Sequence, residues 1–513
     1  MSAPHDAASR TARDDDGHPS LRLRRLGIDT HSEPVVYMRA DCHVCRAEGF
    51  TARERVEVHA GTRTVIATLS VVTSDLLAPG EAGVSEAAWA LLDAREGDAV
   101  RALHPAPVES LAHVRAKLFG HRLDGAAMRA IIDDVVARRY ADIELAAFVA
   151  AGAGDRLDVD ETVALTRAMV DVGQRLSWPR RPVCDKHCVG GLPGNRTTPI
   201  VVAIAAASGL TIPKTSSRAI TSPAGTADAM ETLAPVDLDL DAMRRVVERE
   251  GGCVVWGGAV RLSPADDILI GVERPLDLDS EGQLVASVLS KKAAAGSTHV
   301  LIDMPVGPTA KVRSDEAAAS LVSRLTHVGA AVGLRVECLV TDGTQPVGRG
   351  IGPALEALDV LAVLRNAPDA PTDLRSRATA LAGRLLEIAG RAAPGDGFAL
   401  AARTLATGAA WRKFAAICDA QGGLREPRAA PLTQEVVAPR AGEIAAIDNR
   451  RLARVAKLAG APLARGAGLR LHRRLGDRVA KDEPLYTVHA EARGELAYAL
   501  DYAGRQAEIV SVR

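Results

Sequence analysis

The chain reads DKHCVGGLPGNRTTP from Asp185 to Pro199, and this stretch predicts a strand, a glycine-rich loop and a helix in succession. Its three glycines permit backbone conformations that turn several N–H groups toward one concavity. Thr198 before Pro199 is typical of a helix N-cap followed by proline in the first turn. Because a helix N-terminus favours an anion, and Lys186 adds a full positive charge, the stretch predicts an anion site. It is neither a Walker loop nor a dinucleotide fingerprint, and the alternative is a plain turn between strand and helix.

A second stretch, KTSSRAITSPAGT from Lys214 to Thr226, repeats this chemistry. It carries several hydroxyls together with a lysine and an arginine, and Thr226 precedes a helix that we expect over residues 227–233. Two hydroxyl-rich helix starts after strand-like stretches would bracket one phosphate. The alternative is ordinary N-capping by serine and threonine, which either hydroxyl alone would fit.

A third element begins at Asp279 and continues into a helix. Ser280 and Gln283 have the spacing of a capping box, which predicts the start of this helix. Ser287 and Lys291 are four residues apart and therefore share one face of the helix. Asp279 can present a carboxylate just outside the helix start. The alternative is a capping acid followed by a solvated lysine.

The residues after the glycine-rich stretches predict a parallel sheet. Residues 299–304 and 335–340 are strand-like, and residues 314–328 between them have a helical pattern. A strand, a helix and a strand in succession favour parallel pairing, because the helix carries the chain back across the sheet. Earlier in the chain, Asp124 can cap another helix. The apolar residues that follow it have the spacing of an amphipathic helix; they are Met128, Ile131, Ile132, Val135 and Val136.

The chain is too long for one hydrophobic core, since its 513 residues exceed the ~250–300 that a single core supports. We therefore predict a multidomain α/β protein. Its expected parts are a disordered tail over residues 1–20, a small mixed and β-rich domain over 21–104, a helical lobe over 110–178, a larger α/β lobe with a mostly parallel sheet over 180–425, and a β-rich C-terminal domain over 433–513.

Composition excludes several classes of protein. The chain has 63 basic and 64 acidic residues, a net charge of −1, and 3% aromatic residues, which argues against a nucleic-acid-binding surface. Its apolar run over 200–207 is far below the ~18 residues of a membrane span, and its acidic N-terminus lacks the apolar region of a secretory signal. Seven scattered cysteines, including the pair Cys42 and Cys45, are typical of reduced thiols. We expect a cytoplasmic protein.

Together these elements resemble the thymidine (pyrimidine-nucleoside) phosphorylase family, and within it the longer subgroup that includes archaeal AMP phosphorylases (type 2 thymidine phosphorylase-like). The likeness runs from about residue 22 to the C-terminus. It is carried by KHCVGG at 186–191, KTSSRAIT at 214–221, GTAD at 225–228, SVLSKK at 287–292, VGPTAK at 306–311 and TDG at 341–343.

The resemblance implies an architecture and a reaction. A helical lobe, which also recruits about residues 275–296, faces a larger α/β lobe across the active site, and a β-rich C-terminal domain and an extra N-terminal domain complete the chain. The implied reaction is phosphorolysis, with inorganic phosphate as co-substrate, no organic cofactor and no metal. The resemblance also implies a homodimer through the helical lobe or a larger homo-oligomer. From composition we expect no nucleic-acid or membrane partner.

The resemblance further assigns roles to residues of this chain. It implies that phosphate is held by Lys186, Thr198, Ser216 and Thr226. It places His187, Ser287 and Lys291 next to the nucleobase. It assigns catalysis to His187, Asp279 and Lys291, with Asp279 as the proton donor. The remaining substrate contacts that it implies are Gly191, Ser217, Arg218, Thr221, Ser222, Ser287 and Lys311.

Two positions depart from the family pattern. Cys188 stands where the family has a phosphate-contacting serine, and a thiol is the weaker hydrogen-bonding group. The arginine that contacts the pyrimidine in the shorter enzymes aligns with Val272, and Arg274 lies two positions further on. Asp279 suits a base that gains from protonation as it leaves, as a purine does.

These observations leave several hypotheses. We favour a thymidine or related pyrimidine-nucleoside phosphorylase, because the broad family is mostly of that type. The alternative is a nucleoside 5′-monophosphate (AMP) phosphorylase that gives ribose 1,5-bisphosphate, with a 5′-phosphate pocket for which the candidates are Arg196, Arg218 and Lys311. A non-catalytic nucleotide-binding protein is a further possibility, motivated by Cys188. A phosphoribosyltransferase ranks lower, because the phosphate loops lack an acidic pair at metal-binding spacing.

Overall fold

A computed structural model describes residues 20–31, 33–219, 222–260, 262–276, 278, 280–506 and 508–513. The chain forms two compact units, the first ending at Ala151 and the second beginning at Gly152. The tail expected over residues 1–20 lies outside the described residues except for Ser20. In the described part, no helix is both long enough and apolar enough to cross a membrane.

The first unit contains a closed barrel of six strands. In barrel order they are β1 (Leu21–Arg25), β5 (Glu81–Val84), β2 (Val35–Arg39), β4 (Arg63–Val72), β3 (Arg55–Ala60) and β6 (Ala99–Leu103). Alternate residues of β3 point into the barrel, where Val56 and Val58 are buried. Two short helices accompany the strands, α1 (His43–Glu48) and α2 (Glu86–Leu92).

Three helices follow the barrel in the same unit, α3 (Leu111–Leu118), α4 (Gly125–Val136) and α5 (Asp142–Ala151). The expected amphipathic helix is confirmed as α4. The Asp124 carboxylate caps it by accepting the Ala127 N–H at 2.8 Å, and its apolar face is buried from Met128 to Val135. The next helix, α6 (Val159–Asp171), belongs to the second unit.

The second unit is built on five parallel strands. β11 (Arg335–Asp342), β10 (His299–Val306) and β7 (Cys184–Cys188) pair in that order, and β8 (Ile212–Ser216) pairs with β9 (Gly252–Trp256). A parallel bridge between Val183 and Thr211 joins the two groups. The predicted strand–helix–strand unit is confirmed, with α12 (Asp315–Ala331) connecting β10 to β11.

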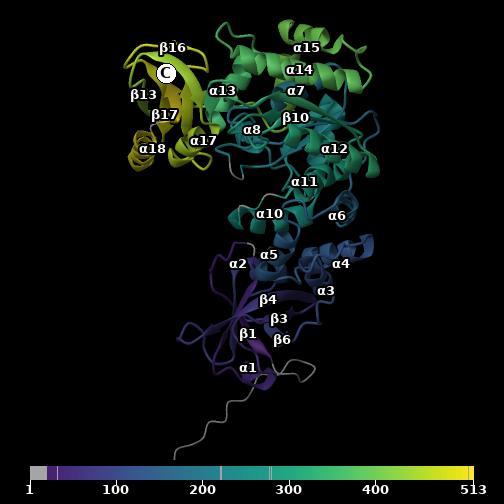
Figure 1. Ribbon diagram of the computed structural model, residues 1–513. Helices are drawn as coiled ribbons and strands as arrows, with labels where there is room; N and C mark the ends of the chain where they lie inside the picture. Colours follow the sequence, from purple (N-terminus) through teal and green to yellow (C-terminus); the bar gives the residue numbers. More distant parts are fainter. Residues whose placement is uncertain are drawn as a thin grey trace, which may run out of the picture. The chain divides into compact units, whose positions relative to one another are not determined.

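Helices cover both faces of this sheet (Figure 1). Leu301 packs with α7 (Thr198–Ala207), α14 (Thr372–Ile388) and α16 (Ala409–Ala420), whereas its neighbours Val300 and Ile302 pack with α12 and with α11 (Glu281–Ala294). Because successive strand residues point to opposite faces, the apolar run at residues 300–302 of β10 fills both cores. The other helices of this unit before the C-terminal part are α8 (Thr226–Glu231), α9 (Leu240–Glu250), α10 (Pro264–Leu276), α13 (Pro353–Leu364) and α15 (Gly397–Ala406).

The last part of the second unit, residues 432–512, is called here the C-terminal module. It contains β13 (Leu432–Val437), β14 (Gly442–Ile447), α17 (Asn449–Leu458), β15 (Gly468–Leu471), β16 (Arg478–Val479), β17 (Pro484–Ala490), α18 (Arg493–Arg505) and β18 (Val510–Val512). β12 (Gly350–Ile351), which precedes the module by about 80 residues, pairs antiparallel with β15. Main-chain pairing therefore ties the module to the chain that follows β11.

We expect Phe414→Ala to destabilise the second unit. Phe414 is fully buried in the core formed by α7, α14 and α16, and truncating a buried phenylalanine costs about 3–5 kcal/mol. Denaturant unfolding followed by tryptophan fluorescence, to which Trp411 on the same helix contributes, measures the loss. Phe398→Ala is the matched control, because Phe398 is 53% exposed and its truncation should cost about 0.5 kcal/mol or less. Equal losses in the two variants would contradict this description of the core.

Candidate active site

The carboxyl ends of the parallel strands gather the residues singled out in the sequence. β7 ends at Cys188, β8 at Ser216, β10 at Val306 and β11 at Asp342. The loops that follow are the glycine loop (residues 189–197), the hydroxyl loop (217–225), and residues 307–314 and 343–349. In open α/β sheets this edge is where ligands bind, because loops and helix N-termini converge there.

Lys186 is fully buried on β7 and faces the start of α7. Its Nζ donates a hydrogen bond to Thr197 Oγ1 at 2.8 Å and to Thr198 Oγ1 at 3.5 Å. The expectation that Thr198 caps α7 is off by one residue: the cap position is Thr197, which has helical backbone angles and makes no capping hydrogen bond with its side chain. Both hydroxyls therefore accept hydrogen bonds from Lys186, and Thr198 forms part of the helix itself.

The Asp303 carboxylate on β10 balances Lys186. Its Oδ2 lies 3.6 Å from the lysine Nζ and accepts the Asn195 amide at 2.9 Å, while its Oδ1 accepts the Thr341 hydroxyl at 2.7 Å. Burial opposes ionisation, but the charge of Lys186 and these hydrogen bonds hold the pKa of Asp303 below its usual value. Asn195 also donates to Cys188 Sγ at 3.4 Å, and burial raises the pKa of that thiol to about 11. Cys188 is therefore a neutral thiol in this loop.

Arg196 joins the glycine loop to the hydroxyl loop. Its Nη1 donates to Thr226 Oγ1 at 2.7 Å and its Nη2 to the Ala224 carbonyl at 2.9 Å. The Nε of Arg196 donates a hydrogen bond of 2.7 Å to the Glu356 carboxylate, which is 1% exposed. Thr226 is the first residue of α8, so the arginine fixes the two predicted phosphate-binding helix starts relative to each other.

A second buried ion cluster lies on β7 around Asp185. Lys214 Nζ lies 3.3 Å from Asp185 Oδ1, and Lys292 Nζ lies 2.9 Å from Asp185 Oδ2. All three residues are at most 3% exposed. Burial lowers the pKa of Lys214 to about 7, against the opposing charge of Asp185. The cluster thus carries at most one surplus positive charge, and that charge depends on pH.

His187 follows Lys186 on β7 and is partly buried. Burial lowers its pKa well below the ordinary value, and the surrounding positive charges act in the same direction; these belong to Lys292, Lys214, Lys291 and Lys186. The imidazole is therefore neutral near pH 7, and it can donate one hydrogen bond and accept another.

α10 contributes acidic side chains that the sequence analysis did not single out. Asp266, which is 1% exposed, forms an ion pair of 2.5 Å with Lys291 of α11. Glu273 lies seven residues after Asp266, on the same helix face. Burial and the charge of Asp266 raise the pKa of Glu273 to about 7, although Lys291 and Lys311 oppose the shift. The seven-residue spacing between Asp266 and Glu273 was the signal in the sequence that could have indicated this acidic helix face.

Two glycines let other loops approach the glycine loop closely. Gly191 has a φ of +79°, and a Cβ there would lie 2.4 Å from the Lys311 backbone nitrogen. Gly194 has a φ of +70°, and a Cβ there would lie 2.1 Å from the Val347 carbonyl oxygen. Any side chain at either position would displace backbone, so both positions require glycine. Gly191 and Lys311, predicted as substrate contacts, are thus neighbours.

Arg218, at the start of the hydroxyl loop, is surrounded by carboxylates. It forms ion pairs of 2.7 Å with Glu231, 3.4 Å with Asp228 and 3.4 Å with Asp237. Its guanidinium also lies 4.9 Å from the centre of the Trp256 ring. The hydrogen bond and charge of Glu231 raise its pKa further. Most of the positive charge of Arg218 is therefore neutralised within the protein.

The other predicted site residues lie near these groups or outside the described residues. Ser216 Oγ, at the end of β8, donates to the Val255 carbonyl at 3.0 Å, and Ser222 Oγ donates to the Ala224 carbonyl at 2.9 Å. Ser217 is exposed, and Ser287 lies one turn before Lys291 on α11. Thr221 and Asp279 fall among the residues that the structure does not describe.

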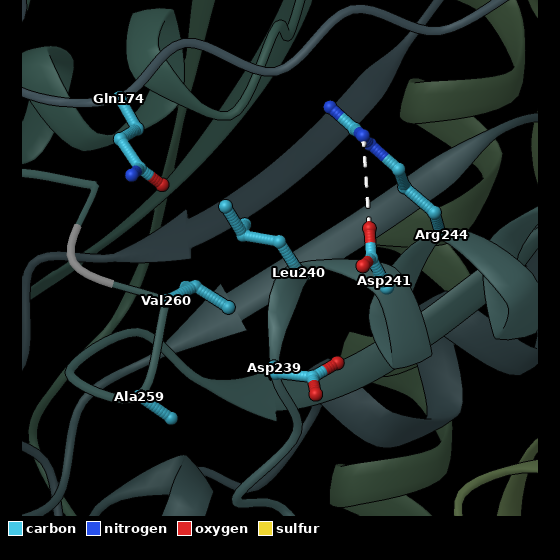
Figure 2. A pocket seen from close by; sticks show the side chains of 7 residues that line it. All are labelled: Gln174, Asp239, Leu240, Asp241, Arg244, Ala259 and Val260. Atoms are coloured by element: carbon cyan, nitrogen blue, oxygen red, sulfur yellow. Dashed lines mark ion pairs between the residues drawn. The ribbon is translucent and has the colours of Figure 1, made fainter.

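The pocket drawn in Figure 2 lies elsewhere, at the start of α9. Asp239, Leu240, Asp241 and Arg244 line one part of it, and Gln174, Ala259 and Val260 line the rest. Asp241 and Arg244 form an ion pair of 3.9 Å across one turn of the helix. None of the predicted site residues lines this pocket.

Three family models match the chain in order. Residues 111–173 match the helical bundle domain of the glycosyl transferase family, residues 180–411 match its a/b domain, and residues 443–509 match the pyrimidine nucleoside phosphorylase C-terminal domain. Among solved structures, an anthranilate phosphoribosyltransferase from Thermus thermophilus is 19% identical, with a TM-score of 0.49 over 60% of this chain and 98% of its own.

Curated relatives are similar over nearly the whole chain. A protein of Polaromonas sp. (strain JS666 / ATCC BAA-500) named "Putative thymidine phosphorylase" is 67% identical over 492 residues, which is 96% of each chain. A protein of Legionella pneumophila with the same name is 58% identical over 490 residues, 96% of this chain and 95% of its own. With such identity over its length and all three domain matches in order, the chain belongs to the thymidine and pyrimidine-nucleoside phosphorylase family and is a pentosyltransferase.

Proposed function

We propose that the protein catalyses the phosphorolysis of thymidine or a related pyrimidine nucleoside. An oxygen of inorganic phosphate forms the new bond to C1′, and the C1′–N bond breaks with its electron pair leaving on the base. The base takes up a proton, and the products are the free base and (deoxy)ribose 1-phosphate. The sugar passes through a cationic state, so catalysis depends mainly on placing charges around it.

The connection between the two predicted phosphate loops carries this proposal. Lys186 contacts the hydroxyls of Thr197 and Thr198, and Arg196 contacts that of Thr226, so both helix starts converge on one region. Buried cations and helix N-terminal N–H groups together favour a phosphate dianion over a neutral ligand. Lys186, Thr198, Ser216 and Thr226 remain the proposed phosphate ligands, with Ser216 at the end of the adjacent strand β8.

The nucleotide alternative requires a cation for the 5′-phosphate. Arg218 already interacts with three carboxylates, and Arg196 is engaged by Glu356, Thr226 and the Ala224 carbonyl. A cation surrounded by three carboxylates gains little from binding a further anion, which argues against Arg218 as a ligand of the 5′-phosphate. Arg196 and Lys311 are then the candidate cations for the nucleotide alternative.

Protonation of the leaving base requires an acid. The neutral imidazole of His187 can supply a hydrogen bond to the base, but it carries no surplus proton near pH 7. Glu273 can supply one, because burial and the charge of Asp266 raise its pKa to about 7, and it interacts electrostatically with Lys291. Asp279 remains the proton donor implied by the resemblance. We propose Glu273 as the donor that the described residues offer.

Phosphate-dependent release of base from thymidine, uridine, cytidine and AMP, measured side by side by liquid chromatography, tests the proposed function. We expect turnover of at least one pyrimidine nucleoside that requires added phosphate. Turnover of AMP alone would contradict the nucleoside hypothesis. Binding without turnover of any of the four substrates would instead favour a non-catalytic nucleotide-binding protein.

Lys186→Ala and His187→Ala should each lower kcat/KM by about two orders of magnitude or more, since each removes a contact to developing charge. Initial rates over a range of nucleoside concentrations at saturating phosphate give kcat/KM. Lys413→Ala and His327→Ala are matched controls, because Lys413 pairs with Glu250 away from the site and His327 is exposed on α12. Near-normal activity of both site variants would overturn the assignment.

Glu273→Gln should change the pH profile of kcat. Burial and Asp266 raise the pKa of Glu273 to about 7, so the protonated form that donates a proton is lost as pH rises through 7. Wild-type kcat should therefore fall between about pH 6 and pH 8, and this fall should be absent from the variant, whose overall rate is lower. Glu316→Gln, on the exposed first turn of α12, is the control. An unchanged slope in the Glu273 variant would exclude its role as proton donor.

A further inference from the structure

Asn449 connects the C-terminal module to the loops of the candidate site. It is the first residue of α17 and is 1% exposed. Its Nδ2 donates to Thr309 Oγ1 at 2.9 Å and to the Gly343 carbonyl at 3.0 Å, and its backbone N–H donates to Thr309 Oγ1 at 3.2 Å. One side chain therefore binds both the loop that follows β10 and the loop that follows β11.

These two loops are packed directly against each other. A Cβ on Gly307 would lie 2.4 Å from the Gly343 carbonyl carbon and oxygen, and a Cβ on Gly343 would lie 2.9 Å from the Val306 backbone. Such contact leaves no room for an independent shift of either loop. Asn449 bridges the pair at this point, so it holds them as one body.

The same loops support the glycine loop. Thr309 lies two residues before Lys311, and a Cβ on Gly191 would lie 2.4 Å from the Lys311 backbone nitrogen. On the other side, a Cβ on Gly194 would lie 2.1 Å from the Val347 carbonyl, and the Val347 N–H donates to the Pro193 carbonyl at 3.2 Å. The glycine loop therefore rests on residues 307–311 and on residues 345–348.

The C-terminal module also contacts residues 345–348, the second segment on which the glycine loop rests. Arg474 Nη2 donates to the Gly348 carbonyl at 2.6 Å, and its Nη1 forms an ion pair of 2.8 Å with Asp373. The Leu475 N–H donates to Gln345 Oε1 at 3.0 Å. Contacts from the module thus reach both segments on which the glycine loop rests.

The chemistry of Asn449 points to positioning in addition to stability. Its side chain is buried, and its Nδ2 reaches a hydroxyl on one loop and a carbonyl on the other. An amide at this position does supply two donors in different directions, which the two loops require.

We propose that the C-terminal module is a structural part of the active site, in which Asn449 is the positioning residue for residues 307–313 and, through them, for the glycine loop. The consequence for catalysis rests on the proposed function, whereas the consequence for the loops does not. Loss of the Asn449 contacts should loosen residues 307–313 and 189–197 while the sheet below them stays ordered.

Hydrogen exchange by mass spectrometry on the full chain tests the positioning directly. In Asn449→Ala, amides in 307–313 and 189–197 should exchange about fivefold faster, the scale of one lost net hydrogen bond. Thr309→Val should reproduce the effect from the other side of the contact, and Thr309→Ser, which keeps the hydroxyl, should restore wild-type exchange. Unchanged exchange in both Asn449→Ala and Thr309→Val would overturn the proposal.

Asp448→Ala is the matched control at the same helix start. Asp448 Oδ1 caps α17 by accepting the Arg450 and Arg451 N–H groups at 2.9 and 3.0 Å, so its loss weakens the helix but leaves the Asn449 contacts in place. We expect faster exchange within α17 and no change in 307–313 or 189–197. Equal loosening of those segments in Asp448→Ala and Asn449→Ala would assign the effect to the helix alone and overturn the positioning role.

Kinetics then separate positioning from stability. Asn449→Ala and Thr309→Val should each raise KM for the nucleoside about fivefold with a smaller change in kcat, and the double variant should be no worse than either single one. Additive losses, or a lower thermal midpoint without a change in KM, would reduce Asn449 to a structural residue. Absence of turnover in the wild type would refute the proposed function, and the exchange experiment would still decide the positioning role.

Discussion

The site depends on pairing charges that are buried on both faces of one strand. β7 directs Asp185 toward Lys214 and Lys292, and directs Lys186 toward Asp303. Removing one member of such a pair leaves an unpaired charge in a dry interior, which is far more costly than losing a surface ion pair. The strand, the sheet partners and the helix that contribute these groups must therefore take up their positions together.

The same charge balance supports the phosphate site proposed at this edge of the sheet. The two clusters contain the three lysines Lys186, Lys214 and Lys292 against the two carboxylates Asp185 and Asp303. The surplus positive charge belongs to lysines of β7, β8 and α11, and Lys186 among them contacts Thr197 and Thr198 at the start of α7. The same lysines act together with burial, the larger cause, to hold the pKa of His187 well below its ordinary value.

Much of the local structure was predictable because short-range rules govern it. The spacing of apolar residues predicted α4, and the alternation of strand-like and helical stretches predicted β10, α12 and β11. The glycine loop was recognisable from residues that tolerate positive φ. The barrel closure was not predictable, because it depends on pairing between strands as distant as β1 and β6. Asn449 was missed for the same reason, since it acquires its partners from segments distant in the sequence. Glu273 was missed because its raised pKa depends mainly on burial, which only packing supplies.

The sequence by itself determined which chemical groups the site contains and the order of the elements that carry them. It could not determine how those groups are paired. Only the tertiary structure decided that Arg218 is neutralised by carboxylates, that Thr197 and Thr198 face Lys186, and that the C-terminal module contacts the site loops. The physical reason is that hydrogen bonds and ion pairs act over a few ångströms. Residues far apart in the chain come within that range only when the helices and strands pack.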